Sequence, residues 1–390
     1  MRKNKINLLV VIRHPVGGIR TYLKYTYKHL DPGKYQLTVL TVRNPEGSQI
    51  QTDLGGFDIR MVEVDNQQAE LRLVLEMVKL LSTNTYDLIH SQGFTAGALS
   101  VVGNACFGVP HVLTSHDVLR EDQFGKTAFG QIKRRLFGQL LGRADVIQSV
   151  SHDAEANLLE YFPGLSGGKP LLRVILNGID VDAFASGMGQ GSNGVLRRDL
   201  GIAEGAVLFG FLGRFMPQKG FEYLVDAVDM IAKDDKYGKR LKVLAVNDGA
   251  YIREYKALID SKRLSEYFMF HGFVPDVRTI LEGIDALVMP SLWEAYGLIA
   301  AEALLIGCPV IASDCIGLRE VTRGTPALTV RTKDATSLAD AMIRFMANPV
   351  TIRLETKRYM QEARTRYDSR KTAAQLDALF DETIERRCRR

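Results

Sequence analysis

The sequence predicts an α/β protein made of two doubly wound domains, each built around a parallel sheet. Two observations predict this class. The chain has 390 residues, of which 46% are hydrophobic and 24% are charged, and this length suits two folded domains better than one. Short apolar runs rich in β-branched residues also alternate with segments of helical periodicity. This βαβ alternation is typical of parallel sheets whose strands are buried on both faces.

The first domain is predicted to span residues 1–185. The apolar run near the amino terminus ends at Arg13 without a cleavage site, so we interpret it as a strand and not as a signal peptide. Strands are expected at 7–12, 36–42, 87–90, 111–115, 146–150 and 172–176. Helices are expected at 18–30, 70–81 and 95–107.

A linker is predicted at 186–205, where the sequence becomes rich in glycine and serine. The second domain follows at 206–370. Its strands are expected at 207–212, 241–247, 267–272, 286–289 and 310–312, and its helices at 221–233, 249–260, 276–282 and 298–306. Apolar residues at helical spacing predict a last helix within 371–390. Two α/β halves joined by a linker would leave a cleft between them.

Charge and cysteine content exclude several classes of protein. Fifty basic and 45 acidic residues give a formal net charge of +5, which argues against a dedicated nucleic-acid binder. The four cysteines form no CxxC pair and have no histidine at zinc-ligand spacing, so we expect neither disulfides nor zinc and favour a reduced, cytoplasmic setting. No apolar run reaches the roughly 18 residues that span a bilayer. Any membrane contact is therefore expected to be peripheral.

Ligands of open α/β sheets bind beyond the carboxyl ends of the strands, so the loops there are the most informative. Gly17 and Gly18 follow the first strand and precede a helix, which allows close backbone approach and offers free N–H groups. The pattern is not GxGxxG, so NAD is disfavoured. Arg214 and Lys219 follow the first strand of the second domain, and such a pair suits a diphosphate. The alternative is a solvated loop with two surface charges.

The loop after the strand at 286–289 is the most specific. Glu294 lies in this loop, and Gly297 with Leu298 opens a helix that carries Glu302. The helix N-terminus can bind an anion, and a carboxylate such as Glu302 can accept hydrogen bonds from two ribose hydroxyls. Both glutamates could also be ordinary surface charges.

Taken together, these segments resemble the retaining glycosyltransferases of family 4. Glu294 and Glu302 are separated by seven residues, as in the EX7E motif of that family. The chain also contains segments similar to the family's diphosphate loop, its interdomain signature, the segment with its donor-sugar histidine and its glycine loop: GRFMPQKG, NGID, TSHD and HPVGGIRTY. The resemblance covers nearly the whole chain in order. It implies the GT-B fold, in which two Rossmann-like domains face a central cleft and the last helix usually returns to the first domain.

The resemblance also implies a role for each matching residue. Arg214 and Lys219 would hold the diphosphate of a nucleotide sugar without a metal or other cofactor. Glu302 would bind ribose, and Glu294 would bind the transferred sugar. The N–H groups of Tyr296, Gly297 and Leu298 would contact sugar and phosphate, with Gly17 and Gly18 also on the donor side. His116, just after the strand at 111–115, would lie near the donor sugar, although Asp117 or the backbone could simply satisfy this histidine.

The sequence departs from the family pattern in three places. Tyr296 stands where phenylalanine is common, Ile316 and Gly317 stand where two glycines are common, and VNDGA at 246–250 lacks the first glycine of a GxG. These changes could reshape the donor pocket. They leave the base and the sugar open.

The implied reaction is transfer of a sugar from a nucleotide-diphosphate sugar to a glycan, lipid-linked or small-molecule acceptor, by front-face displacement with retention. Three alternatives stay open: a nucleotide-sugar epimerase, a non-catalytic nucleotide-sugar-binding subunit, and a pyridoxal-dependent phosphorylase, for which the chain looks short. The segment 126–143 is basic on one face and apolar on another. It is either an interfacial helix or one packed on the first domain.

Overall fold

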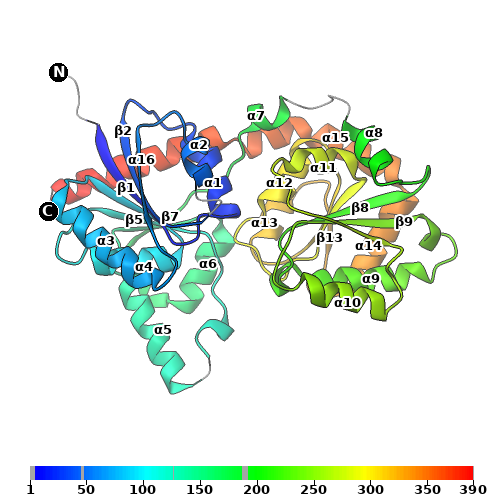
Figure 1. Cartoon of the computed structure of the whole chain (residues 1–390), viewed down its shortest axis with the longest axis horizontal. Helices are drawn as coiled ribbons and strands as arrows, with labels where there is room; N and C mark the ends of the chain where they lie inside the picture. The colour runs from blue at the N-terminus through cyan, green and yellow to red at the C-terminus, as the bar shows by residue number, and fades with distance from the viewer. Residues whose placement is uncertain (1–4, 45–47, 126, 187–191, 390) are drawn as a thin grey trace. The chain divides into compact units, whose positions relative to one another are not determined.

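The structure is a computed structural model that describes residues 5–44, 48–125, 127–186 and 192–389. The chain divides into two compact units, coloured along the sequence in Figure 1. Unit 1 comprises Met1–Asp180 and Ser369–Arg390, and unit 2 comprises Val181–Asp368. Each unit contains one parallel sheet.

Unit 1 is built around a sheet whose described strands run in the order β3-β2-β1-β4-β5-β6-β7. The strands are β1 (Ile6–Ile12), β2 (Tyr35–Val42), β3 (Ile59–Val64), β4 (Leu88–Gln92), β5 (His111–Ser115), β6 (Val146–Ser149) and β7 (Leu171–Val174). Its helices are α1 (Gly18–Tyr27), α2 (Ser48–Asp53), α3 (Ala69–Thr83), α4 (Phe94–Gly103), α5 (Ala128–Leu141), α6 (His152–Tyr161) and α16 (Ser369–Cys388), with short turns η1 (Glu121–Gln123) and η2 (Pro163–Leu165).

The two faces of this sheet are buried by different helices. Leu8, Val10 and Ile12 of β1 pack in one cluster with residues of α1 and α16. Leu9 and Val11 point to the opposite face, into a cluster that includes residues of α3. Alternate residues of a strand point to opposite faces, so β1 is apolar from Leu8 to Ile12 because helices cover it on both sides. The last helix, α16, drawn in red in Figure 1, thus belongs to the core of unit 1.

Sequence analysis missed the edge strand β3. Its residues are partly exposed, and the charged Arg60 and Glu63 interrupt its apolar pattern. An edge strand does not need the continuous apolar run that identifies a central strand. Similar reasoning explains why the three-residue edge strand β13 (Leu328–Val330) of unit 2 was not predicted.

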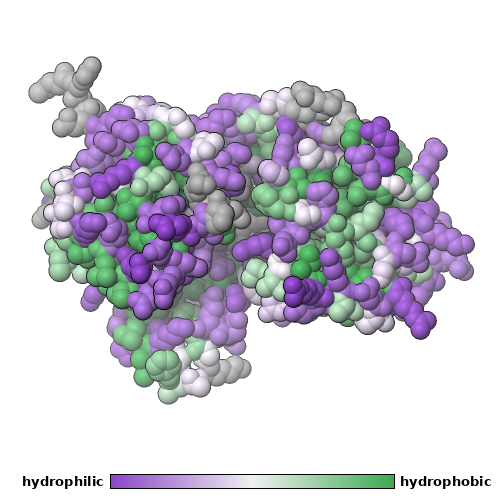
Figure 2. All heavy atoms as spheres, in the orientation of Figure 1, coloured by the Kyte–Doolittle hydropathy of each residue, from purple (hydrophilic) through white to green (hydrophobic). Residues whose placement is uncertain are grey.

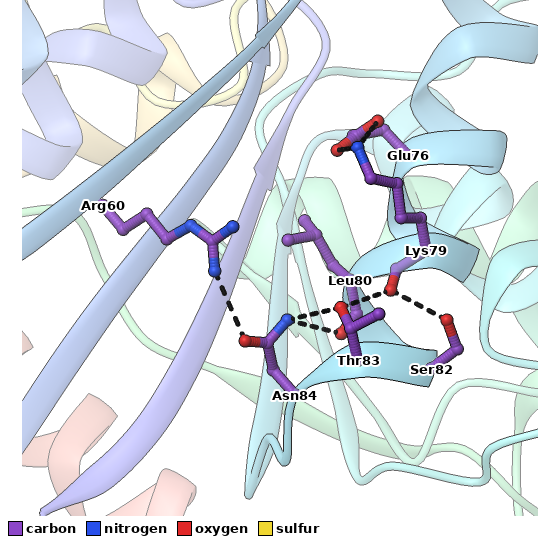
Figure 3. Close-up of polar contacts among 7 residues, drawn as sticks. All are labelled: Arg60, Glu76, Lys79, Leu80, Ser82, Thr83 and Asn84. Carbon is purple, nitrogen blue, oxygen red and sulfur yellow. Dashed lines mark hydrogen bonds and ion pairs between the residues drawn. The ribbon is translucent and has the colours of Figure 1, made fainter.

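Side chains at the carboxyl end of α3 donate hydrogen bonds to backbone carbonyls of its last turns (Figure 3). Asn84 Nδ2 donates to the carbonyl oxygen of Leu80 at 3.0 Å, and its Oδ1 accepts from Arg60 Nη1 of β3 at 3.3 Å. Ser82 and Thr83 both donate to the carbonyl of Lys79. These bonds end the helix where the chain turns into β4.

Unit 2 repeats the doubly wound pattern with the described strand order β10-β9-β8-β11-β12-β13. Its strands are β8 (Val207–Leu212), β9 (Leu241–Val246), β10 (Phe268–His271), β11 (Ala286–Met289), β12 (Val310–Ser313) and β13. Its helices are α7 (Val181–Ala185), α8 (Ser192–Asp199), α9 (Phe221–Ala232), α10 (Ile252–Ser261), α11 (Val277–Gly283), α12 (Leu298–Leu305), α13 (Leu318–Thr322), α14 (Ala335–Ala347) and α15 (Pro349–Arg366), with turns η3 (Pro217–Lys219) and η4 (Gly238–Arg240).

The segment assigned to a linker contains ordered parts that pack on unit 2. Arg197 of α8 forms an ion pair with Asp285 at 3.0 Å. Leu196 packs against Gly283: a Cβ added at Gly283 would come within 2.3 Å of the Leu196 side chain. Residues 187–191 of the predicted linker lie outside the described residues. The change from unit 1 to unit 2 falls at Asp180 and Val181, and the return falls at Asp368 and Ser369.

Candidate functional site

The loop after β8 carries the two predicted diphosphate ligands. Arg214 is exposed, and its guanidinium makes no hydrogen bond or ion pair with any residue that the structure describes. Lys219 ends the short turn η3, and its aliphatic chain runs over Gly213, where a Cβ would lie 3.5 Å from Cε. Gly220 then needs its positive φ of 62°, and a Cβ there would lie 2.0 Å from the carbonyl oxygen of Pro290. This loop is therefore fixed against the end of β11.

Lys219 and Glu294 are brought together as an ion pair. The Lys219 Nζ to Glu294 Oε1 distance is 2.6 Å, and the two side chains are only 20% and 10% exposed. Ser291 Oγ donates to the same Oε1 at 2.8 Å. Sequence analysis predicted both charged residues for the donor site but assigned them to different parts of the ligand. The structure makes them direct partners, and it adds Ser291, which sequence analysis did not select.

The backbone around Glu294 is held by the loop that follows β12. Glu294 N donates to the carbonyl oxygen of Ile316 at 3.1 Å. Gly317 has a φ of 77°, and a Cβ there would lie 2.1 Å from the carbonyl oxygen of Glu294. Ser313 Oγ donates to the carbonyl of Ser291. Of the two residues that replace the common glycine pair, Ile316 therefore serves through its backbone and Gly317 supplies the required conformation.

A buried cysteine lies in the same loop. Cys315 is 4% exposed, and burial raises the pKa of its thiol to about 12. The nearby carboxylate of Glu294 acts in the same direction. Since the thiolate is the reactive form, this thiol is a packing group and not a nucleophile.

The start of α12 presents backbone donors. Gly297 precedes the helix with a φ of 98°, and a Cβ there would lie 2.7 Å from Leu318 Cδ1. The N–H groups of Gly297 and Leu298 have no acceptor among the described residues, as expected for the first turn of a helix. Tyr296 instead turns its side chain inward, where burial raises the pKa of its phenol well above the ordinary value. Glu302 lies inside α12 and is only 3% exposed.

An asparagine replaces the first glycine of the GxG pattern in a backbone conformation that favours glycine. Asn247 follows β9 with a φ of 114°, which favours glycine and which asparagine tolerates better than most residues. Its Oδ1 accepts from the N–H of Asp248 at 2.8 Å. Gly249, the second glycine of the pattern, is required because a Cβ there would lie 2.4 Å from Phe215 N. The loop thus keeps a conformation suited to glycine without the first glycine.

In unit 1, Gly17 and Gly18 are exposed and form the start of α1. Gly17 has a φ of 58°, and a Cβ at either position would meet nothing within 4 Å. Only the backbone at Gly17 needs glycine for its conformation. The open space around both residues agrees with a loop that a ligand could approach.

His116 follows β5 and is held by a glutamine, not by Asp117 as sequence analysis allowed. Its Nε2 lies 2.7 Å from Oε1 of Gln92, the last residue of β4. Its ring lies edge-on to Tyr22 of α1, with ring centroids 4.7 Å apart. Burial lowers the pKa of His116 to about 3. The histidine is therefore neutral at physiological pH, with its proton on Nε2 and an acceptor lone pair on Nδ1.

A buried chain of hydrogen bonds lies behind His116. Gln148 Nε2 donates to two backbone carbonyls, so its Oε1 accepts from Thr114 Oγ1 at 2.7 Å. Thr114 Oγ1 must then accept from His90 Nε2, 2.6 Å away. His90 Nδ1 is left to accept from the hydroxyl of Tyr27 at 2.6 Å. Each bond fixes the direction of the next, so His90 is neutral in one tautomer.

These buried histidines predict acid sensitivity. Burial lowers the pKa of His111 to about 4 and holds the pKa of His90 well below its ordinary value. Together with His116 these are three buried histidines that would each protonate near pH 6.5 in the unfolded chain. The unfolded state therefore binds more protons near and below that pH, and the protein becomes less stable as the pH falls. We expect the apparent free energy of unfolding to drop by about 4 kcal/mol between pH 7.5 and 5.5. Urea unfolding at both values measures this.

Two variants test whether the buried histidines cause the dependence of stability on pH. His111→Gln removes one of the three buried imidazoles and should lower the dependence on pH by roughly a third, whatever it does to absolute stability. His271→Gln removes an exposed ring and should leave the dependence unchanged. Equal dependence in the wild type and in His111→Gln would contradict the prediction.

Solved structures with the same fold define the class of protein. The chain superposes on Anabaena HepE in complex with UDP-glucose with a TM-score of 0.82 and 21% identity, covering 97% of this chain and 100% of that one. It superposes on WaaG, a glycosyltransferase involved in lipopolysaccharide biosynthesis, with a TM-score of 0.72 and 15% identity, covering 95% and 99%. Two doubly wound units with these neighbours constitute the GT-B fold of glycosyltransferases.

Family models of glycosyltransferases match both halves of the chain. The family model described as Glycosyltransferase Family 4 matches residues 16–183, and the model described as Glycosyl transferases group 1 matches residues 206–348. Together they span about four fifths of the chain. The protein is therefore a glycosyltransferase, as the resemblance of its motifs implied.

Two curated relatives agree with this assignment. D-inositol 3-phosphate glycosyltransferase of Saccharomonospora viridis is 29% identical over 310 residues, which are 76% of this chain and 69% of that protein. UDP-Gal:alpha-D-GlcNAc-diphosphoundecaprenol alpha-1,3-galactosyltransferase of Escherichia coli is 25% identical over 279 residues, 70% of each chain. The two relatives are named for different kinds of acceptor.

The described residues contain neither a helix that could span a membrane nor a group of side chains suited to a metal ion. None of the described helices is long and apolar enough to cross a bilayer. Across the same residues, His, Cys, Asp and Glu side chains form no group of three or more that could hold a metal ion.

Proposed function

We propose that the protein transfers a sugar from a nucleotide-diphosphate sugar to an acceptor hydroxyl with retention of anomeric configuration and without an essential metal. The pairing of Lys219 with Glu294 carries the proposal, together with Arg214 of the same loop, whose guanidinium has no partner among the described residues. This arrangement supports a site in which the carboxylate binds the sugar and the two cations bind the diphosphate.

The cations would bind the diphosphate. A lysine ammonium has three N–H donors, and the contact with Glu294 Oε1 uses one, so donors remain for phosphate oxygens. Arg214 offers a planar fork without a competing protein partner among the described residues. The N–H groups of Gly297 and Leu298 add partial positive charge at the start of α12. These groups would stabilise the charge that develops on the leaving diphosphate.

Glu294 and Glu302 would hold hydroxyl groups of the donor. Lys219 and Ser291 both contact Oε1 of Glu294, which leaves Oε2 to accept from the transferred sugar. Glu302 would accept from the ribose hydroxyls, as the family motif implies. In this proposal Lys219 also orients Glu294, so the sugar and diphosphate contacts depend on each other.

Unit 1 would contribute Gly17, Gly18 and His116. The neutral His116 would be a hydrogen-bonding group for the sugar, because burial keeps its pKa far below the pH of the reaction. It would not act as a general acid or base. The backbone of Gly17 and Gly18 is open to a ligand at the start of α1.

The reaction would proceed on one face of the sugar. The acceptor oxygen would form a bond to the anomeric carbon while the bond from that carbon to the diphosphate oxygen breaks. The acceptor proton would pass to the leaving phosphate oxygen, so no protein base is needed beneath the sugar. Positioning and charge stabilisation would supply most of the rate enhancement.

Thermal shift with UDP, GDP and ADP and their sugar conjugates tests the donor. We expect UDP compounds to stabilise the protein, because HepE was solved with UDP-glucose and the Escherichia coli relative is named for UDP-Gal. A nucleotide concentration of one hundred times Kd would add about 2.7 kcal/mol to the free energy of unfolding. The shift should be equal in magnesium and in EDTA. If none of these nucleotides raised the unfolding temperature, the donor assignment would be contradicted and a partner-dependent or non-catalytic protein would be favoured.

Product analysis tests the reaction itself. Proton NMR of the product should show the anomeric configuration of the donor. A changed sugar in the absence of an acceptor would point to the epimerase alternative. An inverted product would contradict the front-face mechanism while leaving the donor assignment intact.

A further inference from the structure

Polar side chains lie inside unit 1 at the carboxyl ends of its neighbouring strands β4 and β5. Figure 2 shows hydrophilic residues over much of the visible surface of both units. Gln92 is nevertheless only 1% exposed, and His90 and Thr114 are completely buried. Buried polar groups need hydrogen-bond partners within the protein. The surroundings of Gln92 therefore determine how its amide is oriented, and this amide contacts His116.

The amide nitrogen of Gln92 lies against the ring of His90. Gln92 Nε2 is 3.2 Å from both Nδ1 and Nε2 of that ring. A point at this equal distance from the two ring nitrogens avoids the ring carbons only if it lies outside the ring plane. Within the plane, Tyr27 and Thr114 already bind the two nitrogens. Gln92 therefore faces the π surface of His90 and not one of its nitrogen lone pairs.

The π surface of His90 sets the orientation of the Gln92 amide. The face of an aromatic ring carries partial negative charge, so it attracts an N–H group and repels a carbonyl oxygen. This favours the amide nitrogen over His90 and the amide oxygen toward His116. An amide oxygen can only accept a hydrogen bond. His116 Nε2, which lies 2.7 Å from this oxygen, must therefore donate, and the proton of the neutral ring is held there.

The other ring nitrogen of His116 is left as an acceptor. Nδ1 contacts no donor among the residues that the structure describes. It is also not one of the enclosed polar atoms without a partner in that part of the chain. The edge-on contact with Tyr22, with ring centroids 4.7 Å apart, restrains the ring further. A ligand at His116 thus meets a nitrogen that can accept a hydrogen bond but cannot donate one.

We propose that Gln92 is a positioning residue of the transfer reaction and that it sets the direction of the hydrogen bond between His116 and the donor sugar. The inference rests on the proposed function, in which His116 binds that sugar. With Nδ1 held as an acceptor, His116 binds the sugar through a hydroxyl group that donates to it. A sugar that lacks this hydroxyl has no proton to offer. Gln92, itself buried, acts on sugar selection through His116.

Nitrogen NMR of the full chain with isotope-labelled histidine tests the tautomer directly. Proton–nitrogen correlation spectra distinguish an imidazole protonated on Nε2, on Nδ1 or on both. His116→Gln identifies the signals of this ring among the seven histidines. We expect the form protonated on Nε2 in the wild-type protein without a ligand. The form protonated on Nδ1 would overturn the proposal.

Gln92→Met tests the consequence for the sugar. The variant removes the acceptor with little change in side-chain length, since a thioether sulfur accepts hydrogen bonds only weakly. We expect His116 to lose its single tautomer and the affinity for UDP-glucose or UDP-galactose to fall by about three- to tenfold. The affinity for UDP alone should be unchanged, because Arg214 and Lys219 belong to unit 2. Isothermal titration measures both affinities.

Monodeoxy analogues of the more tightly bound UDP-hexose identify the hydroxyl. In the wild type, one analogue should bind about three- to tenfold more weakly than the parent compound. The same analogue should bind Gln92→Met no more weakly than the parent compound does, because the directed acceptor is already lost. Equal losses in the two proteins for every analogue would overturn the proposal.

Gln148→Met is the matched control. Gln148 is also buried, and its amide bonds two backbone carbonyls and Thr114. Its loss should lower stability while His116 keeps its proton on Nε2 and the affinity for the UDP-hexose is unchanged. Equal losses of sugar affinity in Gln148→Met and Gln92→Met would show a general effect of packing and would overturn the proposal.

The measurements separate this inference from the proposed function. If the wild type bound neither UDP nor a UDP-hexose, the proposed function would be contradicted and the inference with it. If the wild type bound both and Gln92→Met kept the full affinity for the UDP-hexose, only the role of Gln92 would be overturned. Loss of sugar affinity with UDP affinity retained, together with a changed His116 tautomer, would support the inference.

Discussion

Replacing Lys219 by methionine is expected to lower kcat by about a hundredfold or more and to weaken nucleoside-diphosphate binding by about ten- to a hundredfold. One charge-assisted contact to a phosphate is worth about 1.5 to 3 kcal/mol in binding. Loss of a group that stabilises transition-state charge typically costs two to three orders of magnitude in rate. Isothermal titration with UDP and steady-state kinetics with a UDP-sugar measure the two effects.

The ion pair means that Lys219→Met also disturbs Glu294. The carboxylate, with its side chain 10% exposed, would keep Ser291 but lose its cation. We expect a loss of about 1 to 3 kcal/mol of stability from the unpaired carboxylate. Glu294→Gln should remove that penalty, because the amide oxygen can still accept from Ser291. The double variant should therefore recover stability but not activity.

The single and double variants together separate the effect of Lys219 on stability from its effect on catalysis. A double-mutant cycle in stability should give a coupling of about 1 to 3 kcal/mol between the two positions. Lys262→Met is the control, since Lys262 pairs with Asp226 at 3.2 Å on the surface of unit 2 and should affect activity little. Recovery of activity together with stability in the double variant would show that Lys219 serves only to support the fold.

Gly317→Ala is expected to cost at least 3 kcal/mol of stability and most of the activity. Its φ of 77° disfavours any side chain by roughly 1 kcal/mol. The added Cβ would also lie 2.1 Å from the carbonyl oxygen of Glu294, and backbone on backbone cannot yield cheaply. Relief of that contact must displace Glu294, whose N–H is bound to Ile316 in the same loop.

Gly324→Ala is the matched control for this prediction. Gly324 has nearly the same φ, 73°, but a Cβ there would meet nothing within 4 Å. It should cost only about 1 kcal/mol and leave kcat unchanged. Chemical unfolding and kinetics of the two variants together measure the difference. If Gly317→Ala and Gly324→Ala had equal effects on stability and kcat, the contact of residue 317 with Glu294 would contribute to neither.

The sequence was most informative where strands are buried on both faces. The residues of β1, β8 and β11 form continuous apolar runs because helices cover both sides of each sheet. Two of the four edge strands, β3 and β13, escaped prediction, because charged residues interrupt β3 and β13 has only three residues. The long helix α15 was also missed, since its surface is mostly polar and its buried residues are few.

The candidate site was predicted only in part. Residue types and their places after strands indicated Arg214, Lys219 and Glu294, but not that the last two are partners. Ser291 and Gln92 gave no signal, because a serine or glutamine at the end of a strand is chemically ordinary. Partners such as Ser291 and Gln92 can be identified only from interatomic distances in the folded structure.

Residue order alone was enough to predict the α/β class, the two doubly wound halves and the likeness to glycosyltransferases. Local periodicity and the spacing of a few motif residues depend on neighbours in the chain, so these features can be read without coordinates. Three contacts became apparent from the folded structure: Lys219 neutralises Glu294, Gly317 leaves space for the carbonyl of Glu294, and Gln92 fixes the proton of His116. Those contacts join residues 23 to 75 positions apart or lie in backbone geometry. Their energies depend on burial and distance, which residue order does not encode locally.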